Sequence, residues 1–307
     1  MTNGELAFLA LAEELNFTRA AEKLYISQQG LSDHIKRLEE EYDTTLVTRK
    51  PHVALTETGL LLRNMLLSKQ TFEKDLKSAI NDINQGDVGT VNVGIALSRL
   101  RVYACDIVQN FYEILPKVEI YIIGVLTVDL IQQLERGDLD IVIGVNAPAQ
   151  KVLHVEPLFN DPVYLVIPDH VAAERTGDAA RVRIQDYEDV PFIRDFHDST
   201  TNALVDDFLT KQNVHLKNIV AVSDYNVQAA LCNRLDAAMF CSKSFAFFSR
   251  GEVMMKGLRV LEIENFKHEM TISIITNNQR VYPKCVYQFI DVARESLLEF
   301  YNKKIAE

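Results

Sequence analysis

The sequence predicts an N-terminal all-α winged helix-turn-helix, a long linker helix and a C-terminal α/β domain. Three observations support this. Apolar residues recur with helical spacing up to Tyr42, and two short runs rich in β-branched residues follow. A single uninterrupted helical pattern then extends to Asn84. After Gly89, short β-branched runs alternate with helical stretches, which is typical of an α/β domain with a largely parallel sheet.

The composition is that of an ordinary globular protein. With 307 residues, of which 48% are apolar and 24% charged, the chain is long enough for two domains. No apolar run reaches the roughly 18 residues of a membrane span. The first fifteen residues lack a basic start and contain Glu5, Glu13 and Glu14, so we expect no signal peptide, no membrane and a cytoplasmic location.

The charge balance argues against a simple nucleic-acid binder. The net charge is −11, whereas many nucleic-acid-binding proteins are basic. Residues 1–57 contain six Lys and Arg against ten Asp and Glu, a net charge of −4. Any contact with DNA must therefore depend on where the cations are placed.

The first two predicted helices form the start of the N-terminal domain. Phe8, Leu11 and Leu15 lie on one face of a first helix. Thr18 is a candidate N-cap for a second helix over residues 19–24, in which two adjacent alanines at 20 and 21 allow close helix packing. Ser27 is the candidate N-cap of a third helix.

The third predicted helix has two distinct faces. Its buried stripe consists of Leu31, Ile35, Leu38 and Tyr42. The opposite face is polar, and such a face is often merely solvated. Here, however, Ser and Gln side chains that can bond to base edges crowd the first turn, and cations that suit phosphates follow one turn later. These residues are Ser27, Gln28, Gln29, Ser32, Lys36 and Arg37.

A small hairpin follows the third helix. Residues 44–48 and 52–56 read as two short strands around Arg49, Lys50 and Pro51. Such a wing can place its two cations against the DNA backbone or minor groove. The wing favours DNA binding over a merely solvated helix face.

The N-terminal domain resembles that of LysR-type transcriptional regulators. The matching residues run from Phe17-Thr18-Arg19-Ala20-Ala21 through Ser27-Gln28 and Leu31-Ser32 to Leu55-Thr56-Glu57-Thr58-Gly59. This chain has Gln29-Gly30 where the family usually has Pro-Ala, and Asp33 where a polar or basic residue is common. The resemblance implies double-stranded DNA as a partner, and the residues expected to contact it are Thr18, Arg19, Ser27, Gln28, Gln29, Ser32, Asp33, Lys36, Arg37, Arg49 and Lys50.

The linker helix carries a repeat of apolar residues spaced alternately by three and four positions, with one lysine at position 69. This repeat predicts a dimer seam, whereas a helix lying on its own domain would show a wider apolar face. The resemblance implies a dimer or tetramer formed through this helix. The seam residues are Leu62, Met65, Phe72, Leu76, Ala79 and Ile83. The expected domains are residues 1–58, 59–88 and 89–307, with the boundary at the Gly86 to Gly89 segment.

The stretch Leu134-x-x-Gly137-x-Leu139-Asp140-Ile141-Val142-Ile143-Gly144 and the later stretch Leu231–Phe240 resemble the effector-binding domain of the same family, which is similar to periplasmic binding proteins. Strands are expected at residues 91–96, 118–124, 139–145, 163–168, 190–193, 219–223, 236–241 and 270–276, and helices at 99–112, 128–136, 201–212, 226–234 and 282–302. The resemblance implies two subdomains joined by crossing strands. The first lobe is about 90–161 plus 268–307, and the second is about 162–267.

Ligands of such folds bind at the carboxyl ends of strands. We therefore expect a small-molecule effector, with anions among the candidates, to contact residues that follow strands: Ser98, Arg99, Thr127, Arg194, Asp195 and Phe196. Ser98 and Thr127 could instead serve only as helix caps, and Arg194 could pair with Asp195 or Asp198 on the surface.

No catalytic or metal motif is present. The seven histidines include no HExxH, and neither a GxSxG nor a P-loop occurs. His197-Asp198-Ser199 are adjacent in sequence, which does not make a catalytic triad. The four cysteines show no CxxC, and redox sensing by Cys232 and Cys241 is a weaker alternative because both fall in a stretch expected to be buried.

We thus expect a DNA-binding transcriptional regulator that responds to a small-molecule effector, with no enzymatic activity, cofactor or metal. The alternative is a solute-sensing protein whose N-terminal domain binds a protein partner in place of DNA. The acidic balance of that domain is the observation that favours this alternative.

Overall fold

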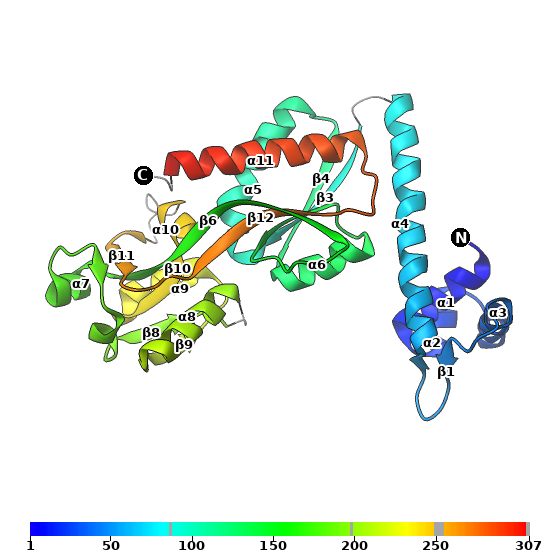
Figure 1. Ribbon diagram of the computed structural model, residues 1–307, viewed down its shortest axis with the longest axis horizontal. Coiled ribbons are helices and arrows are strands. Elements are labelled where there is room, and N and C mark those ends of the chain that lie inside the picture. Colours follow the sequence, from blue (N-terminus) through cyan, green and yellow to red (C-terminus); the bar gives the residue numbers. More distant parts are fainter. Residues whose placement is uncertain (86–87, 197–198, 249–254, 305–307) are drawn as a thin grey trace. The chain divides into compact units, whose positions relative to one another are not determined.

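The structure is a computed structural model that describes residues 1–85, 88–196, 199–248 and 255–304. The chain divides into two compact units (Figure 1). The first contains residues 1–86 with the short segments Arg136–Asp138 and Arg280–Pro283, and the second contains the remainder. The predicted boundary residues Gly86 and Asp87 lie outside the described part of the chain.

Three capped helices form the core of the first unit: α1 (Asn3–Glu14), α2 (Phe17–Lys23) and α3 (Gln28–Glu41). Ser27 caps α3 as predicted, since its Oγ accepts from the Gly30 N–H at 3.0 Å. The predicted helix α2 is present, but its predicted N-cap was wrong. Asn16 is its N-cap and Thr18 is the second helical residue, because the Asn16 amide oxygen accepts from both the Thr18 and Arg19 N–H groups.

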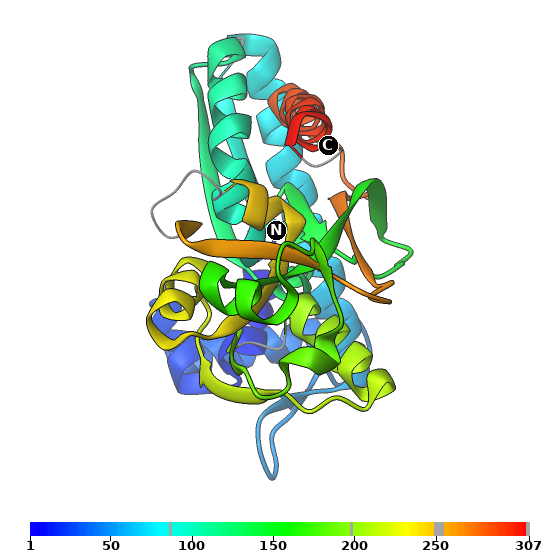
Figure 2. The same cartoon turned by 90° about the vertical axis from the view of Figure 1, so that its left-hand side faces the viewer.

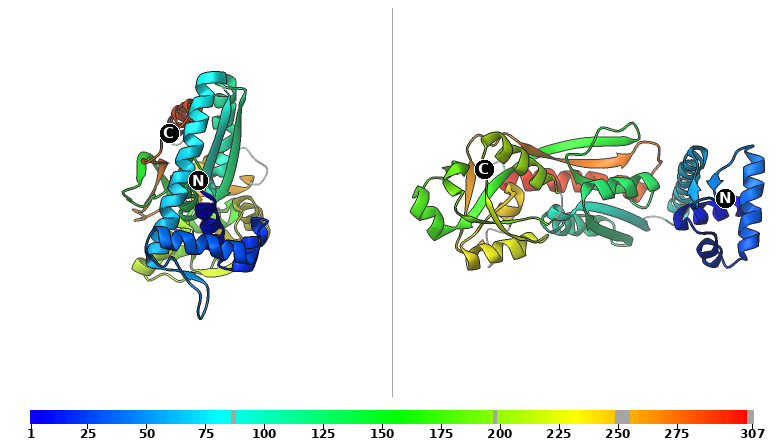
Figure 3. Two further views of the ribbon diagram at one scale, coloured as in Figure 1. Left: turned by 90° about the vertical axis from the view of Figure 1, so that its right-hand side faces the viewer. Right: turned by 90° about the horizontal axis from the view of Figure 1, so that it is seen from below.

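The wing is confirmed as a hairpin, with strands shorter than predicted. Strand β1 (Val47–Thr48) pairs antiparallel with β2 (Ala54–Leu55), and the loop between them projects from the helices (Figure 3). Leu46 and Val47 are buried against the helices. Tyr42, expected in the buried stripe of α3, is instead the C-cap of that helix and is 47% exposed.

Helix α4 (Glu57–Gln85) turns one side to the three helices and leaves another side open. Leu66 is buried, and Leu62 packs against the same core. The Lys69 ammonium lies 2.8 Å from the Glu5 carboxylate of α1, and this hydrogen bond lowers the pKa of Glu5. Leu62 and Lys69 therefore contact their own domain.

The open side of α4 carries Met65, Phe72 and Leu76, which are 62%, 55% and 50% exposed. Leu61, at 64% exposure, extends this stripe in place of the predicted Leu62. The side chains of Ala79 and Ile83 lie outside the described part of the structure. The stripe of Leu61, Met65, Phe72 and Leu76 is hereafter called the α4 stripe.

The second unit is built on a ten-stranded sheet with the central order β4-β3-β5-β12-β6-β10-β8-β9. In its first lobe, β3 (Gly89–Ala96) pairs in parallel with β4 (Val118–Val125) and β5 (Ile141–Val145). The connecting helices are α5 (Leu97–Ile114) and α6 (Thr127–Arg136). These elements lie close to their predicted positions.

In the second lobe, β8 (Pro191–Arg194) pairs in parallel with β9 (Lys217–Ala221) and β10 (Ala238–Ser242). Helices α8 (Thr200–Gln212) and α9 (Tyr225–Leu235) were predicted. The elements that were not predicted are α7 (Asp169–Thr176), β7 (Arg181–Val182), a short 3-10 helix (Ile184–Tyr187), α10 (Lys243–Phe248) and β11 (Leu258–Ile263).

Two long strands run through both lobes. Strand β6 (Leu153–Pro168) pairs antiparallel with β12 (Glu269–Asn277) at one end and with β10 and β11 at the other (Figure 1). The sheet is therefore mixed, and the expectation of a largely parallel sheet holds only inside each lobe. Crossing strands of this kind agree with the arrangement that the family resemblance implied.

The last helix, α11 (Lys284–Lys304), completes the first lobe. It crosses α5 (Figure 2), with the Phe111 and Phe289 rings 5.0 Å apart. The Asn110 amide donates to the Ser296 hydroxyl at 2.9 Å. Helix α11 thus supplies one wall of the first lobe's core.

Candidate functional site

The polar face of α3 is open to solvent. Gln28, Gln29 and Asp33 are exposed and Ser32 is half-buried, whereas Leu31 and Ile35 on the opposite side are buried in the core. The helix is therefore anchored by its apolar side and presents its amides and hydroxyls outward. Among the polar side chains of this face, the Ser27 hydroxyl is the one that stabilises the fold, because it caps α3.

The cations near this face are exposed, and their ion pairs with neighbouring carboxylates are weak. Arg19 lies 3.5 Å from Glu14, and Lys36 lies 3.5 Å from Glu40, in pairs that water screens. The Arg49 guanidinium sits 5.2 Å from the centroid of the Phe17 ring, which fixes the base of the wing to α2. Together with Arg37 and Lys50, these side chains can bind phosphate groups without breaking any strong pair.

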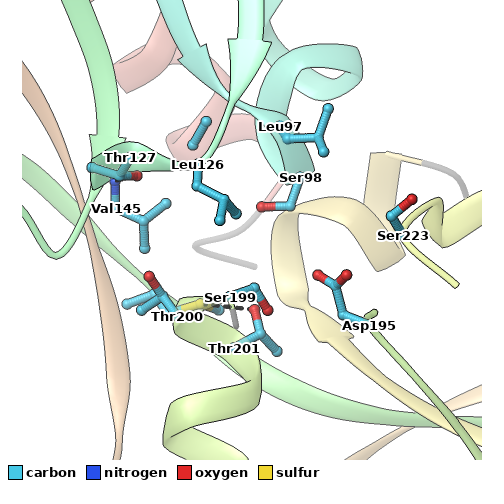
Figure 4. A pocket seen from close by; sticks show the side chains of 12 residues that line it. Leu97, Ser98, Leu126, Thr127, Val145, Asp195, Ser199, Thr200, Thr201 and Ser223 are labelled. Carbon is cyan, nitrogen blue, oxygen red and sulfur yellow. Dashed lines mark hydrogen bonds between the residues drawn. The ribbon is translucent and has the colours of Figure 1, made fainter. Parts of the chain in front are cut away.

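A second site lies in the second unit, between its two lobes. Its internal volume is about 40 Å³. At roughly 10–15 Å³ per enclosed water, this has room for only a few water molecules or a very small ligand. The pocket is lined by Ala96, Leu97, Ser98, Leu126, Thr127, Val145, Asp195, Ser199, Thr200, Thr201, Ser223 and Met270 (Figure 4).

Three helices begin at this pocket. The first turns of α5 at Leu97, of α6 at Thr127 and of α8 at Thr200 all contribute lining residues. Because amide N–H groups in the first turn of a helix lack partners within the helix, such positions favour negative groups. The N-cap of α5 is Ala96, which offers no side-chain cap, so the alternative that Ser98 merely caps this helix is not supported.

Hydroxyl groups supply most of the polar lining. Figure 4 shows Ser98 and Thr127 on one side of the pocket and Thr200 and Thr201 on the other. The Thr127 hydroxyl accepts from the Val145 N–H at 3.2 Å, which leaves its proton able to donate. Asp195 places a carboxylate at the same pocket, so the electrostatic environment is not uniformly favourable to anions.

A buried ion pair lies beneath this pocket. Arg99 and Asp161 are both fully buried, and the Arg99 Nε lies 3.0 Å from Asp161 Oδ2, although without the geometry of a hydrogen bond. Burial is the largest single influence on Arg99 and would lower its pKa, but the charge of Asp161 together with the smaller contributions of Tyr103 and Tyr225 outweighs it, and the pKa is raised. Asp161 also accepts from the N–H and hydroxyl of Ser244 at 2.9 and 2.6 Å.

Arg99 connects this pair to the pocket lining. Its Nη1 donates to the Ser98 hydroxyl at 3.0 Å, and its Nη2 approaches the Met270 sulfur at 3.4 Å. The Thr201 hydroxyl also approaches that sulfur and accepts from the buried Tyr225 phenol at 3.2 Å. The pocket floor is thus fixed by contacts from both lobes.

The structure brings only half of the predicted effector residues to the pocket. Ser98, Thr127 and Asp195 line it, whereas Arg99 is buried below it. Arg194 forms an ion pair with Asp206 at 2.7 Å, and Asp198, one of the two partners considered for it, lies outside the described residues. Phe196 is 72% exposed and is absent from the lining.

Sequence reasoning missed several lining residues. Ser199, Thr200 and Thr201 open α8, and the Ser199 hydroxyl caps that helix by accepting from the Asn202 N–H. A run of three hydroxyl residues before a predicted helix is a signal that could have revealed them. Ser223 stands at the carboxyl end of the strand predicted at residues 219–223, so the strand-end criterion could have revealed it, whereas Met270 lies at the start of a strand and meets the pocket only through the fold.

Cys232 and Cys241, the two cysteines considered for redox sensing, are both buried. Burial raises the pKa of Cys232 to about 12 and also raises that of Cys241, which keeps both thiols protonated at neutral pH. His197 and Asp198 lie outside the described residues. Within the ranges that the structure covers, no group of acidic, His and Cys side chains is arranged to hold a metal, and no helix is long and apolar enough to cross a membrane.

Comparisons with known proteins agree with this arrangement. Residues 6–60 match the bacterial regulatory helix-turn-helix protein, lysR family, and residues 84–298 match the LysR substrate binding domain. The chain is 28% identical over 289 residues to a probable RuBisCO transcriptional regulator of Trieres chinensis, covering 91% of this chain and 92% of that protein. It is 29% identical to the protein of the same description from Phaeodactylum tricornutum, with coverage of 95% and 96%.

The fold is also similar to that of a solved full-length regulator. The crystal structure of full-length CbnR complexed with its target DNA matches with a TM-score of 0.63 at 16% identity, covering 96% of this chain and 100% of that one. The two family matches together account for the helix-turn-helix unit and the two-lobed unit. The chain belongs to the LysR family and is a DNA-binding transcriptional regulator with a C-terminal effector-binding domain.

Proposed function

We propose that this regulator reads its operator with the exposed face of α3, anchors itself through the surrounding cations, and responds to a small acid bound in the pocket of its second unit. The observation that carries the DNA-reading assignment is the two-faced structure of α3. Leu31, Ile35 and Leu38 fix one side in the core, while the other side offers Gln28, Gln29 and Ser32 to solvent. We further propose that the protein works in the cytoplasm and without catalysis.

Specificity would come from the α3 face and affinity from the cations. Gln and Ser side chains form hydrogen bonds with base edges, and each good contact of this kind is worth about 1–3 kcal/mol of discrimination. Arg19, Lys36, Arg37, Arg49 and Lys50 would contact phosphates, with Thr18 beside them. Asp33 is exposed among these groups and would disfavour positions where a phosphate comes close.

Ser32→Tyr is expected to lower operator affinity at least tenfold without lowering the melting temperature. Ser32 is half-buried at the base of the exposed face, so a bulky ring there would hold α3 away from the groove. The measurement is a gel shift on an operator duplex. Ser32→Ala, which keeps the side chain small, is the control: it should lose only what one hydroxyl contact supplies and should bind more tightly than Ser32→Tyr. An operator affinity of Ser32→Tyr equal to that of the wild type in the gel shift would remove Ser32 from the DNA-reading face.

The α4 stripe is proposed as the dimer seam. Its four apolar side chains are each at least half exposed in the single chain, and exposed apolar residues that recur along one side of a helix are characteristic of a coiled-coil partner. A dimer would place two α3 helices on two half-sites, which compensates for the acidic balance of each single domain.

Phe72→Glu is expected to convert the protein to monomers at micromolar concentration. The new charge would be buried in the seam, whereas Gln70→Glu places the same charge at another exposed position of α4 and should leave the assembly intact. Analytical ultracentrifugation distinguishes the two variants. If Phe72→Glu sediments like the wild type, the seam lies elsewhere.

The chemistry of the pocket suggests the class of effector. Three helix N-termini and the hydroxyls of Ser98, Thr127 and Thr201 suit a carboxylate, while Asp195 suits a hydrogen-bond donor. A small acid with a hydroxyl or ammonium group beside its carboxylate satisfies both requirements. An acid without that donor would leave Asp195 facing a second negative charge.

Lactate or alanine, as probes of this class, should therefore raise the melting temperature by a few degrees, and propionate should do so much less. Thermal shift at equal ligand concentrations makes the comparison. Asp195→Asn should abolish the difference between lactate and propionate, because an amide does not repel a neighbouring anion. Equal shifts with the wild-type protein would exclude Asp195 as the selective group.

A further inference from the structure

The turn between α2 and α3 carries an aromatic residue that the fold does not use. Tyr25 is 97% exposed, and no other large apolar or aromatic side chain in the described ranges is as exposed. No hydrogen bond, ion pair or ring contact of its side chain occurs among those residues. Packing therefore gives no reason for a tyrosine at this position.

The backbone of Tyr25 does not favour a tyrosine either. Its φ is +56°, in the left-handed region where Asn and Gly are preferred. Two hydrogen bonds fix this conformation, from the Tyr25 N–H to Glu22 O at 3.1 Å and from the Ile26 N–H to Ala21 O at 3.0 Å. Ala21 is buried, so the turn is attached to the core and presents the ring at a defined place.

That place lies beside the DNA-reading face. Tyr25 stands two residues before Ser27, the cap of α3, and two residues after Lys23, the last residue of α2. In helix-turn-helix modules the N-terminal residues of the second helix meet base edges while the first helix crosses the backbone. The turn that joins the two helices therefore approaches the sugar-phosphate chain at the edge of the groove.

We infer that Tyr25 contacts the DNA backbone, with its ring against a deoxyribose and its hydroxyl donating to a phosphate oxygen. This inference rests on the proposed function of α3. Tyrosine is suited to the role because its ring is apolar and its hydroxyl is polar, and tyrosine hydroxyls are among the groups that bind phosphates. Among residues 23–28, the exposed Lys23, Ser27 and Gln28 are polar, and Ile26, at 38% exposure, is the one other exposed large apolar side chain. This largely polar setting favours DNA over a protein partner.

Two substitutions test the inference in the full-length protein. Tyr25→Phe removes only the hydroxyl, and Tyr25→Asn removes the ring while suiting the left-handed backbone. Binding is measured to a duplex selected by the wild-type protein from a random pool and to a scrambled duplex. We expect affinity to fall about fivefold for Tyr25→Phe and tenfold or more for Tyr25→Asn, by the same factor on both duplexes. Tyr25→Asn should melt no lower than the wild type.

The salt dependence separates this contact from an ionic one. A neutral hydroxyl releases no counterion, so the slope of log affinity against log salt should stay unchanged, whereas Arg49→Ala should reduce its magnitude by about 0.9. Tyr42→Phe, which alters a half-exposed tyrosine at the opposite end of α3, is the matched control and should bind normally.

Three outcomes would overturn the inference while leaving DNA binding by α3 intact. Both variants could bind both duplexes like the wild type. The loss could be confined to the selected duplex, which would mean that Tyr25 reads a base. The variants could instead bind DNA normally and change only the oligomeric state. If the wild-type protein selects no duplex, or Ser32→Tyr has no effect on the selected one, the proposed function of α3 fails first.

Discussion

Replacing Gly59 by alanine is expected to destabilise the first unit by about 3 kcal/mol or more and to abolish DNA binding at physiological temperature. Gly59 lies in the first turn of α4. A Cβ at this position would stand 2.1 Å from the Leu46 carbonyl oxygen and 3.1 Å from its carbonyl carbon. A contact that close to backbone can be relieved only if one of the two segments moves.

Leu46 cannot easily move away. Its carbonyl oxygen accepts from the Thr56 N–H at 3.0 Å, and its own N–H donates to the Glu39 carboxylate at 2.8 Å. Its side chain is buried in the core, so both the wing and α3 would shift with it. The substitution should therefore disturb the base of the wing and the start of α4 together.

Differential scanning calorimetry of the full-length protein measures the effect. Gly30→Ala is the matched control, since a Cβ there meets only the Ser27 hydroxyl at 3.2 Å. Alanine is the better helix former, so Gly30→Ala should be neutral or stabilising by up to about 1 kcal/mol. A melting temperature for Gly59→Ala equal to that of the wild type would show that α4 lies farther from Leu46 in solution than it does in the structure.

The second large effect is expected at the buried ion pair. Arg99→Met should destabilise the second unit by about 3–5 kcal/mol, because it leaves the Asp161 carboxylate buried without a counter-charge. Ser244 would still donate two hydrogen bonds to that carboxylate, which softens the loss but supplies no positive charge. Urea unfolding followed by circular dichroism at pH 7 provides the measurement.

A double variant isolates the charge as the cause. Adding Asp161→Asn to Arg99→Met removes the uncompensated charge and keeps an amide oxygen for the Ser244 N–H. We expect the double variant to recover most of the lost stability, and Asp161→Asn alone to be destabilised because Arg99 then lacks its counter-charge. If the double variant is no more stable than Arg99→Met, lost packing around Arg99 is the dominant effect.

The helix-turn-helix unit could be predicted from sequence because its signals are local. The Ser27 cap, the stripe of Leu31, Ile35 and Leu38 and the hairpin of the wing each follow from residues close in the chain. The errors there were also local. Asn16, and not Thr18, is the N-cap of α2. Either side chain can cap a helix, and the residue at which the helix begins decides between them.

The pocket was harder to predict because it is assembled by the fold. Ser98, Thr127 and Asp195 follow strands and could be selected on that basis, but Met270 reaches the pocket only because β12 crosses from one lobe to the other. Arg99 also follows a strand, yet it points to the buried Asp161. Adjacency to a strand end identifies the neighbourhood of a site but not the direction of a side chain.

In α4, among the side chains that the structure describes, the spacing of the apolar residues predicted the exposed side of the helix correctly except at one position, where Leu61 is exposed in place of Leu62. Leu62 and Leu61 both fit an apolar repeat, and the packing of Leu62 against the core decides between them. Lys69 appeared as a polar interruption of the seam, but its partner Glu5 is 64 positions away in the chain. A pairing at such a distance leaves no mark in a local pattern.

The crossing strands and the final helix set an order in which the protein can acquire structure on the ribosome. All strands and helices of the second lobe have been synthesised once β11 has been made. At that point only the pairing of β12 with β6 is still missing. The first lobe begins with β3 but lacks a wall until α11 emerges, almost two hundred residues later. The apolar side of α5 around Phe111 therefore lacks its α11 partner through most of translation, and a surface exposed for that long is one that chaperones of nascent chains can bind.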